Sequence, residues 1–147
     1  KLTKANMLKI LIPVDGSDYT ERAVKQVLEL VKSGAALEII LLNVQTPIAS
    51  GHARMFLSHG EVETFQQEEA LAAVAKARAL LEPSGVPCTH HIATGRVGET
   101  IVRFAKEHNI DTIVMGTHGR GSVMEALMGS VAQDVLKNTT LPVLLVQ

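Results

Sequence analysis

The segment DTIVMGTHGRGSVMEALMGSVAQDVL, residues 111–136, joins an apolar run to an amphipathic stretch through a glycine-rich connection. The apolar, partly β-branched run over Thr112–Gly116 predicts a buried strand, and the spacing of apolar residues over Ser130–Lys137 predicts a helix. This segment holds four of the chain's eleven glycines, which are Gly116, Gly119, Gly121 and Gly129. Glycine has no Cβ and so lets the backbone approach another group closely. The segment therefore predicts a strand, a stretch of accessible main chain and a helix start in succession.

The rest of the chain repeats this alternation. Strands are predicted over Leu8–Val14, Leu37–Val44, Val86–Ala93, Thr112–Gly116 and Pro142–Val146. Further helices are predicted over Glu61–Glu82 and Val97–His108, and residues 46–60 are predicted to be irregular. The first helix is expected to start at Asp18, with a capping box to Glu21, and to stop at Ser33-Gly34. The predicted order is βαβαβαβαβ.

This alternation predicts a doubly wound α/β fold. Short connections between unlike elements imply a five-stranded parallel sheet with right-handed crossovers and helices on both faces. For five strands we expect the common order 3-2-1-4-5, which reverses direction between the first and the fourth strand. Ligands bind outside the carboxyl ends of the strands at such a reversal. Topology therefore places residues 13–16 and 115–119 at the expected ligand site.

Composition and charge suit such a fold and argue against several partners. The chain has 147 residues, of which 46% are hydrophobic and 20% charged, with a net charge of -1. One domain over 1–147 is expected, with residues 1–6 interpreted as a leader or an added segment. Without a basic patch or a long apolar run, neither nucleic acid nor a membrane is an expected partner. Cys88 is the only cysteine, which excludes an intrachain disulfide and fits a cytoplasmic location.

The glycine-rich connection has the chemistry of an anion-binding site. Main-chain N–H groups converge at a helix N-terminus, where the helix dipole also favours negative charge. We expect Gly116, Gly119 and Gly121 to form one side of a phosphate site, and Gly129-Ser130 the other. The alternative is that these glycines only form turns and allow a helix to pack closely on the sheet. The residues alone leave both interpretations open.

Three well-known motifs do not match. Gly116-x4-Gly121 is followed by Ser122, so the lysine of a P-loop is missing. The first strand–helix turn, from Asp15 to Asp18, has one glycine and two acidic side chains, unlike a dinucleotide-binding fingerprint. A G-x-S-x-G nucleophile motif does not occur. Fast nucleotide hydrolysis and NAD binding are therefore not expected, and no catalytic residue is assigned.

The spacing Gly116-x2-Gly119-x9-Gly129-Ser130, together with PVDGS at 13–17 and DTIVMG at 111–116, resembles the universal stress protein family. The resemblance extends from Met7 to Gln147 and points to the ATP-binding branch, which has this glycine spacing. It implies an adenine nucleotide alpha hydrolase-like fold with ATP lying across the reversal and Mg²⁺ bridging the phosphates. It also implies a homodimer formed through the last strand, Pro142–Val146. An apolar edge strand left open would invite uncontrolled pairing.

The resemblance also assigns roles to individual residues. The adenosine end would be lined by Pro13, Val14, Asp15, Val44, Met115 and Gly116. Of these, Asp15 would lie near the ribose or a metal ion, and Val44 would contact adenine. The phosphates would be held by N–H groups and one hydroxyl of Gly119, Gly129, Ser130 and Val131, with Arg120 adding positive charge.

Histidines outside this set are not assigned a role. His118 lies within the glycine-rich connection, where an imidazole could contact phosphate or act as a base, but the commoner case of a solvent-facing loop residue is the interpretation adopted. No metal site is expected from the group in and beside the irregular segment, which has no specific ligand spacing: His52, His59 and Glu61. His90 and His91 are adjacent on a predicted strand, so they are expected to point to opposite faces of the sheet.

The leading functional expectation is a cytoplasmic ATP-binding domain in which nucleotide occupancy regulates a stress response. One alternative is slow ATP hydrolysis or phosphate transfer to Ser122 or Ser130, whose hydroxyls would lie beside the phosphates. Another is a dimeric interaction module that binds no nucleotide. The sequence does not separate ATP from ADP or AMP, because the adenine and α-phosphate contacts would be shared.

Overall fold

The computed structural model describes residues 6–47, 59–120 and 127–147. The strands are β1 (Leu8–Pro13), β2 (Leu37–Gln45), β3 (Cys88–Thr94), β4 (Thr112–Gly116) and β5 (Val143–Val146). The helices are α1 (Asp18–Lys32), α3 (His59–Leu81), α4 (Val97–Glu107) and α5 (Ser130–Asn138), with a 3-10 turn η2 (Glu82–Ser84) after α3. The predicted alternation is confirmed. The largest differences are at β3, which begins at Cys88 and not at Val86, and at α3, which begins at His59 and not at Glu61.

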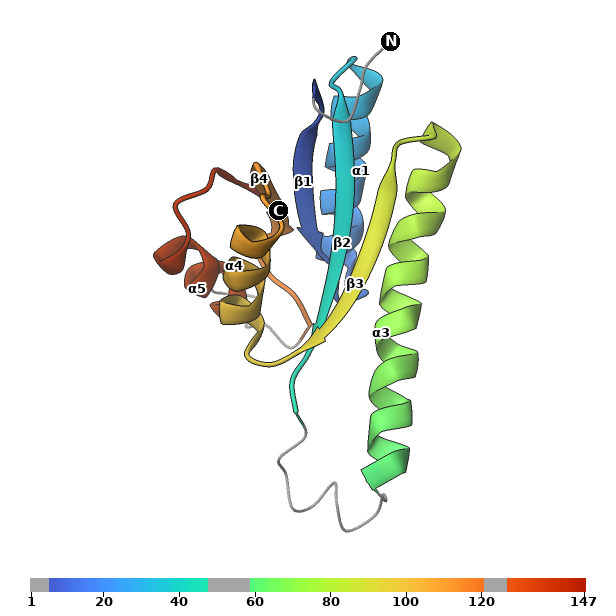
Figure 1. Ribbon diagram of the computed structural model, residues 1–147, viewed down its shortest axis with the longest axis vertical. Helices are drawn as coiled ribbons and strands as arrows, with labels where there is room; N and C mark the ends of the chain where they lie inside the picture. Colours follow the sequence, from blue (N-terminus) through green and yellow to red (C-terminus); the bar gives the residue numbers. More distant parts are fainter. Residues whose placement is uncertain (1–5, 48–58, 121–126) are drawn as a thin grey trace.

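The strands form one parallel sheet in the order β3-β2-β1-β4-β5, as predicted (Figure 1). The central strand β1 pairs with β2 on one side and with β4 on the other, so the direction of winding reverses between β1 and β4. The register aligns Pro13 with Leu42 and Gly116 with Val146. The carboxyl ends of these strands therefore meet at one edge of the sheet.

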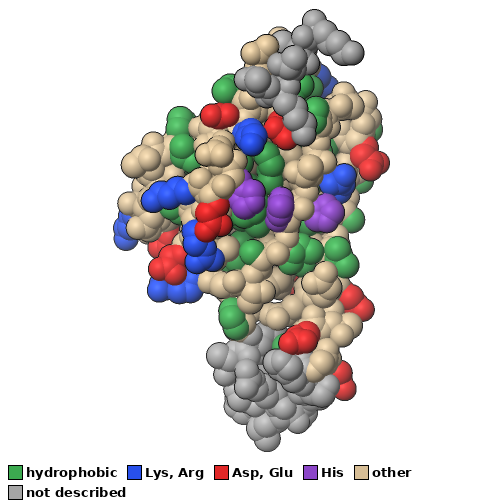
Figure 2. Space-filling view, viewed as in Figure 1, with side chains coloured by type: hydrophobic (Ala, Val, Ile, Leu, Met, Phe, Trp, Pro, Cys, Tyr) green, Lys and Arg blue, Asp and Glu red, His purple; other side chains and the backbone are tan. Residues whose placement is uncertain are grey.

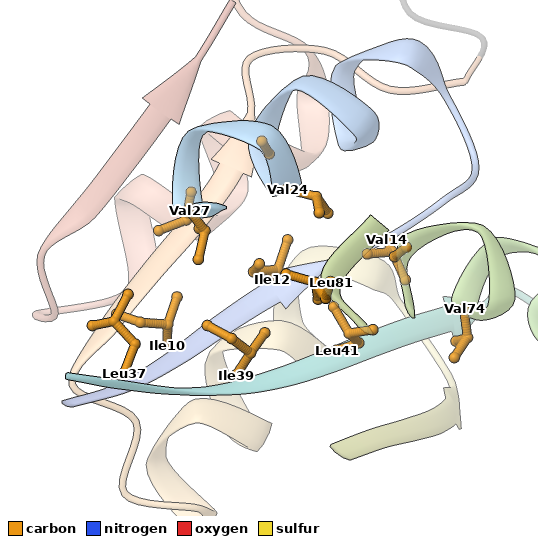
Figure 3. Packing of buried hydrophobic residues seen from close by; sticks show 13 residues of the cluster. Ile10, Ile12, Val14, Val24, Val27, Leu37, Ile39, Leu41, Val74 and Leu81 are labelled. Atoms are coloured by element: carbon orange, nitrogen blue, oxygen red, sulfur yellow. The ribbon is translucent and has the colours of Figure 1, made fainter. Parts of the chain in front are cut away.

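Helices cover both faces of the sheet, with α1 and α3 on one face and α4 and α5 on the other (Figure 1). Successive strand residues point to opposite faces, so Leu41 packs toward α1 and α3 whereas Leu42 packs toward α4 and α5. Figure 3 shows Val24 and Val27 of α1 packing over the first of these faces. None of the described helices combines the length and the apolar character needed to cross a membrane.

The ends of α1 show how local sequence sets an element boundary. The N-cap is Ser17, whose hydroxyl accepts a hydrogen bond from the Thr20 N–H at 3.4 Å. The predicted start of the helix at Asp18 is therefore confirmed, whereas the predicted capping box from Asp18 to Glu21 was wrong, because the cap is the preceding residue, Ser17. The stop at Ser33-Gly34 is confirmed, because Ser33 is the C-cap and Gly34 has a φ of +101°, which favours glycine.

Candidate functional site

A cavity of about 480 Å³ opens where the winding of the sheet reverses between β1 and β4. Its walls are the carboxyl ends of β1, β2 and β4, one side of α4 and the first turn of α5. Apolar side chains from β2, β4 and α4 line much of it, and polar groups come from the loops after β1 and β4. Pockets that bind small molecules usually have volumes of about 300–1,000 Å³ with this mixture of surfaces.

All eleven residues that the family resemblance assigned to a nucleotide site line this cavity, whereas Gly121, also expected at the phosphate side, lies outside the described residues. The eleven are Pro13, Val14, Asp15, Val44, Met115, Gly116, Gly119, Arg120, Gly129, Ser130 and Val131. Thr117 and His118, within the range 115–119 that topology placed at the ligand site, also line the cavity, whereas Gly16 of the range 13–16 does not. The lining residues that the sequence did not indicate include Thr20, Leu42, Val97, Ile101 and Ala132. Some of these carried a usable signal, because Leu42 shares a strand face with Val44, and Val97 shares a helix face with Ile101. Thr20 carried none.

Asp15 is half-buried after β1, and protein donors surround its carboxylate. Its Oδ1 accepts hydrogen bonds from the Ser17 N–H at 2.9 Å and the Thr20 hydroxyl at 2.7 Å, and its Oδ2 accepts one from the Arg120 N–H at 3.1 Å. Burial alone would raise the pKa of Asp15, but a hydrogen bond from the Ser17 side chain together with these three outweighs it and lowers the pKa below its ordinary value. Asp15 is therefore a carboxylate at neutral pH that joins the start of α1 to the loop after β4.

Two of the predicted glycines are required by close approaches. A Cβ on Gly119 would collide with Asp15 Oδ2, so a larger residue there would displace the carboxylate. A Cβ on Gly116 would lie 2.7 Å from the Cβ of Tyr19 on α1, well inside van der Waals contact. Residues without a side chain are therefore needed at the end of β4 and in the loop after it, because this segment lies directly against the loop after β1 and the start of α1.

The N-terminus of α5 opens into the cavity without a side-chain cap. Its N-cap is Gly129, and within the described residues no side chain caps the first turn. Ser130, Val131 and Ala132 lie in this first turn, where an N–H group has no partner within the helix, and all three line the cavity. The Gly129 N–H was expected to hold a phosphate group, but it donates a hydrogen bond to the Thr117 carbonyl at 2.6 Å. That amide is used within the fold, so the amides of the first turn are the better candidates for a ligand.

Arg120 lines the cavity, and its guanidinium forms an ion pair with Glu69 of α3. Both side chains are substantially exposed, so water and salt screen the attraction between them. A ligand with several negative charges would compete with Glu69 for this guanidinium.

His118 does not face solvent as the sequence argument expected. It is half-buried, it lines the cavity, and its Nδ1 lies 3.1 Å from the Thr117 hydroxyl. Its ring lies 5.1 Å from the ring of Tyr19, centroid to centroid. The loop after β4 therefore brings an imidazole as well as main-chain groups to the cavity.

A second group of histidines lies away from the cavity, at the β3 edge of the sheet. His90 Nδ1 lies 3.1 Å from an Arg78 nitrogen on α3, whereas the His91 ring packs edge-on against Phe104 and His108 at the other face. This confirms that His90 and His91 point to opposite faces of the sheet. Figure 2 shows that histidine side chains lie side by side on the face of the molecule that it presents. Burial lowers the pKa of His91, and the neighbouring His108 and His90 lower it further. His91 therefore resists protonation.

The residues considered for a metal site and for phosphate transfer lie partly outside the described residues. In the ranges that the structure covers, no group of three or more His, Cys, Asp or Glu side chains is arranged to hold a metal ion. Several candidates lie outside the described residues: His52, the side chain of His59, Gly121 and Ser122.

The sheet order and the cavity at its reversal define a doubly wound α/β domain with a ligand-sized pocket at its topological switch point. The chain belongs to the universal stress protein family, whose sequence model matches residues 7–147.

Three related proteins give the scale of the similarity. Universal stress protein MJ0531 of Methanocaldococcus jannaschii is 34% identical over 140 residues, which cover 95% of this chain and 81% of that protein. The solved structure of MJ0577 from the same organism is 34% identical, with a TM-score of 0.81 and a coverage of 96% of each chain. A universal stress protein from Archaeoglobus fulgidus, solved in complex with dAMP, has the same fold, with a TM-score of 0.65, 21% identity, and a coverage of 97% of this chain and 99% of that one.

Proposed function

We propose that this chain binds an adenine nucleotide, ATP in particular, in the cavity between β1 and β4, and that occupancy of this site regulates a cytoplasmic stress response. The observation that carries the proposal is the first turn of α5, which opens without a side-chain cap into a cavity of about 480 Å³. A helix N-terminus in this state suits a phosphate group. Family membership and the dAMP complex of the A. fulgidus protein also support it.

The apolar end of the cavity suits an adenine ring. Leu42, Val44, Ile101 and Met115 give it walls from two strands and a helix. An aromatic base buries apolar area against such side chains, which is the main source of affinity at this end. Asp15 lines the cavity beside the loop after β4, where its carboxylate is an acceptor for a ribose hydroxyl.

The phosphate end is formed by the first turn of α5 and by Arg120. Amides at a helix N-terminus and a guanidinium are both donors that favour a polyphosphate over an uncharged group. Mg²⁺ would neutralise phosphate charge, but Asp15 fits poorly as its direct ligand because three protein donors already bond its oxygens. We therefore expect phosphate oxygens and water to hold Mg²⁺, as is usual for this ion.

We also propose that two copies pair through residues 142–146. Among the described strands, β5 pairs with β4 alone and so forms an edge of the sheet. Leu144 on β5 and Leu136 on α5 are both 39% exposed, and an open apolar edge favours pairing with another strand. Sedimentation velocity should show a dimer that Leu144→Lys converts to a monomer. A wild-type monomer at high concentration would refute this pairing.

The nucleotide proposal can be tested at Ser130 without disturbing the helix. Ser130→Pro removes one N–H from the first position of α5, where proline is well tolerated. The preceding residue, Gly129, already has the extended conformation that proline requires, with φ -72° and ψ 167°. Ser130→Ala is the matched control, because it removes the hydroxyl but keeps the N–H.

Calorimetric titrations with ATP and with adenosine would distinguish the outcomes. A hydrogen bond to a charged group contributes about 1.5–3 kcal/mol, so we expect Ser130→Pro to weaken ATP binding by about tenfold or more. Adenosine binding should stay unchanged in both variants. If wild-type protein gave no heat with ATP, or if Ser130→Pro bound ATP as tightly as Ser130→Ala, the proposal would be wrong.

A further inference from the structure

A stack of three side chains lies behind the loop that follows β4. The Arg22 guanidinium carbon lies 4.5 Å from the centroid of the Tyr19 ring, and that ring lies 5.1 Å from the His118 ring at an interplanar angle of 46°. Tyr19 and Arg22 are three positions apart on α1 and so share one side of the helix. Of these three residues, His118 alone lines the cavity. The stack therefore reaches the cavity from α1.

Both ends of this stack are tied to the end of β5. The Arg22 Nε–H donates to the carbonyl of Gln147 at 2.9 Å, directly after β5. The Thr117 N–H, next to His118, donates to the carbonyl of Val146 at 2.9 Å. Arg22 is thus fixed both by the Tyr19 ring and by main chain, which limits the positions open to Tyr19.

The segment held by the stack is the same one that supports the start of α5. Tyr19 packs so closely behind Gly116 that no Cβ fits between them. The Thr117 carbonyl accepts the Gly129 N–H at 2.6 Å, and Gly129 is the N-cap of α5. A shift of residues 116–118 would therefore move the first turn of α5 with it.

We propose that Tyr19 and Arg22 are positioning residues for the phosphate end of the cavity, acting through His118 and the main chain of Thr117. The inference rests on the proposed nucleotide site. A glycine-rich loop has many accessible backbone conformations, and holding it from behind in one of them lowers the entropy lost on binding. Because most of the apolar end of the cavity comes from β2 and α4, which the stack does not touch, the stack should affect phosphate affinity more strongly than nucleoside affinity.

The test compares ATP and adenosine affinities by calorimetry in matched variants. Tyr19→Leu removes the ring and Tyr19→Phe retains it, so the two separate the stacking contact from the hydroxyl. Arg22→Ala removes the cation, and Arg22→Lys keeps a positive charge but lacks the Nε–H. Arg103→Ala, an exposed arginine on α4 at the other face of the sheet, controls for loss of charge.

Aromatic and cation–π contacts of this kind correspond to about a two- to tenfold change in an equilibrium constant. We expect Tyr19→Leu and Arg22→Ala to weaken ATP binding by that factor while adenosine affinity stays within about twofold of wild type. Tyr19→Phe and Arg103→Ala should match wild type for both ligands, and Arg22→Lys should recover part of the loss.

Three results would overturn the inference. Equal losses for ATP and adenosine would indicate a general structural role, and unchanged ATP affinity in Tyr19→Leu would show that the stack does no positioning. Urea unfolding of each variant shows whether a change in affinity comes only from a loss of folded protein. Arg22 is exposed, so its replacement should have little effect on folding. A wild-type protein that binds neither ligand would instead refute the nucleotide site, and this inference with it.

Discussion

Two helices begin at the same edge of the sheet, yet their N-termini are built differently. Residues 14–17 lead from β1 into α1, and the Ser17 hydroxyl caps its first turn, which also contains Asp18 and Glu21. Residues 117–129 lead from β4 into α5, whose first turn contains no acidic residue and no side-chain cap. The dipole of α1 is already balanced by the protein's own oxygens, whereas no side-chain oxygen of the described residues caps α5.

The same contrast appears in the space beside each helix. Against α1 and α3 the structure leaves a hollow of about 10 Å³, too small for any ligand, at the contact lined by Gly16 and Ala73. Against α4 and α5 it leaves the cavity of about 480 Å³. A position at the edge of a parallel sheet is therefore not sufficient for anion binding. Three features decide which helix N-terminus can bind an anion. They are the presence of a side-chain cap, the charge of the first turn and the volume of the cavity in front of it.

The largest expected effect comes from giving α5 the acidic first turn of α1. Ser130→Asp places a carboxylate at the start of α5, where it competes with phosphate for the N–H groups and repels its charge. We expect a loss of ATP affinity of at least about tenfold, measured by calorimetry, together with unchanged or greater stability. Ser130→Asn is the neutral control of similar shape and should bind ATP more tightly than Ser130→Asp. Equal ATP affinities in the two variants would refute a role for charge at this position.

Adding one methyl group to the loop after β4 should have the next largest effect. Gly119→Ala would push Asp15 Oδ2 away and break its hydrogen bond to the Arg120 N–H. Breaking a hydrogen bond to a charged group removes about 1.5–3 kcal/mol, shared here between stability and ATP affinity. Gly60→Ala on α3 is the matched control, because no atom of the described residues outside the backbone of that helix lies within 4 Å of its added Cβ. Urea unfolding and calorimetry should show losses only for Gly119→Ala.

Removal of the α1 cap should lower stability but not ligand affinity. Ser17→Ala takes away the acceptor for the Thr20 N–H, and such losses destabilise a protein by about 0.5–2 kcal/mol. Ser17→Asp should restore the cap and the free energy of unfolding, measured in urea. ATP affinity should stay near the wild-type value in both: although the side-chain hydrogen bond from Ser17 to Asp15 is changed, the Ser17 N–H, the Thr20 hydroxyl and the Arg120 N–H still hold the carboxylate. A loss of ATP affinity in Ser17→Asp would show that the two N-termini are not independent.

The smallest effect concerns the pH dependence that Asp15 gives to stability. A carboxyl whose folded pKa lies below the ordinary value of 3.8 stabilises the fold above that pH, and the stabilisation is lost as the pH falls through the folded pKa. The difference in free energy of unfolding between wild type and Asp15→Asn should therefore be constant from pH 7 to pH 5 and shrink below about pH 4. Urea unfolding at several pH values measures it. A difference that grew in acid would mean that the pKa of Asp15 is raised.

Much of the fold followed from the sequence because its signals are local. Apolar runs and glycine stops located every strand and described helix to within about two residues, and the alternation of elements gave the strand order. The Ser17 cap was missed by one residue because Ser17 and Asp18 are both good caps, and only the backbone geometry chooses between them. The placement of the predicted site residues followed from the strand order, since the reversal brings residues 13–15 and 115–120 together.

Other features depended on contacts between distant segments. Arg120 pairs with Glu69 across 51 sequence positions, and nothing near either residue indicates the partner. His118 was expected to face solvent because its own segment is a loop, whereas its position is set by Tyr19 on another helix. The Gly129 amide was expected to meet a ligand, and the fold uses it for Thr117.

The sequence by itself determined the element order, the winding of the sheet and the position of the glycine-rich segment whose backbone has few side chains. These depend on periodicity, chirality and the missing side chain of glycine, all of which act over a few residues. Only the tertiary structure decided which amides stay available at α5, which protein donors hold Asp15 and what supports the loop from behind. A hydrogen bond or a ring contact goes to whichever group packing brings within reach, and that depends on the whole chain at once.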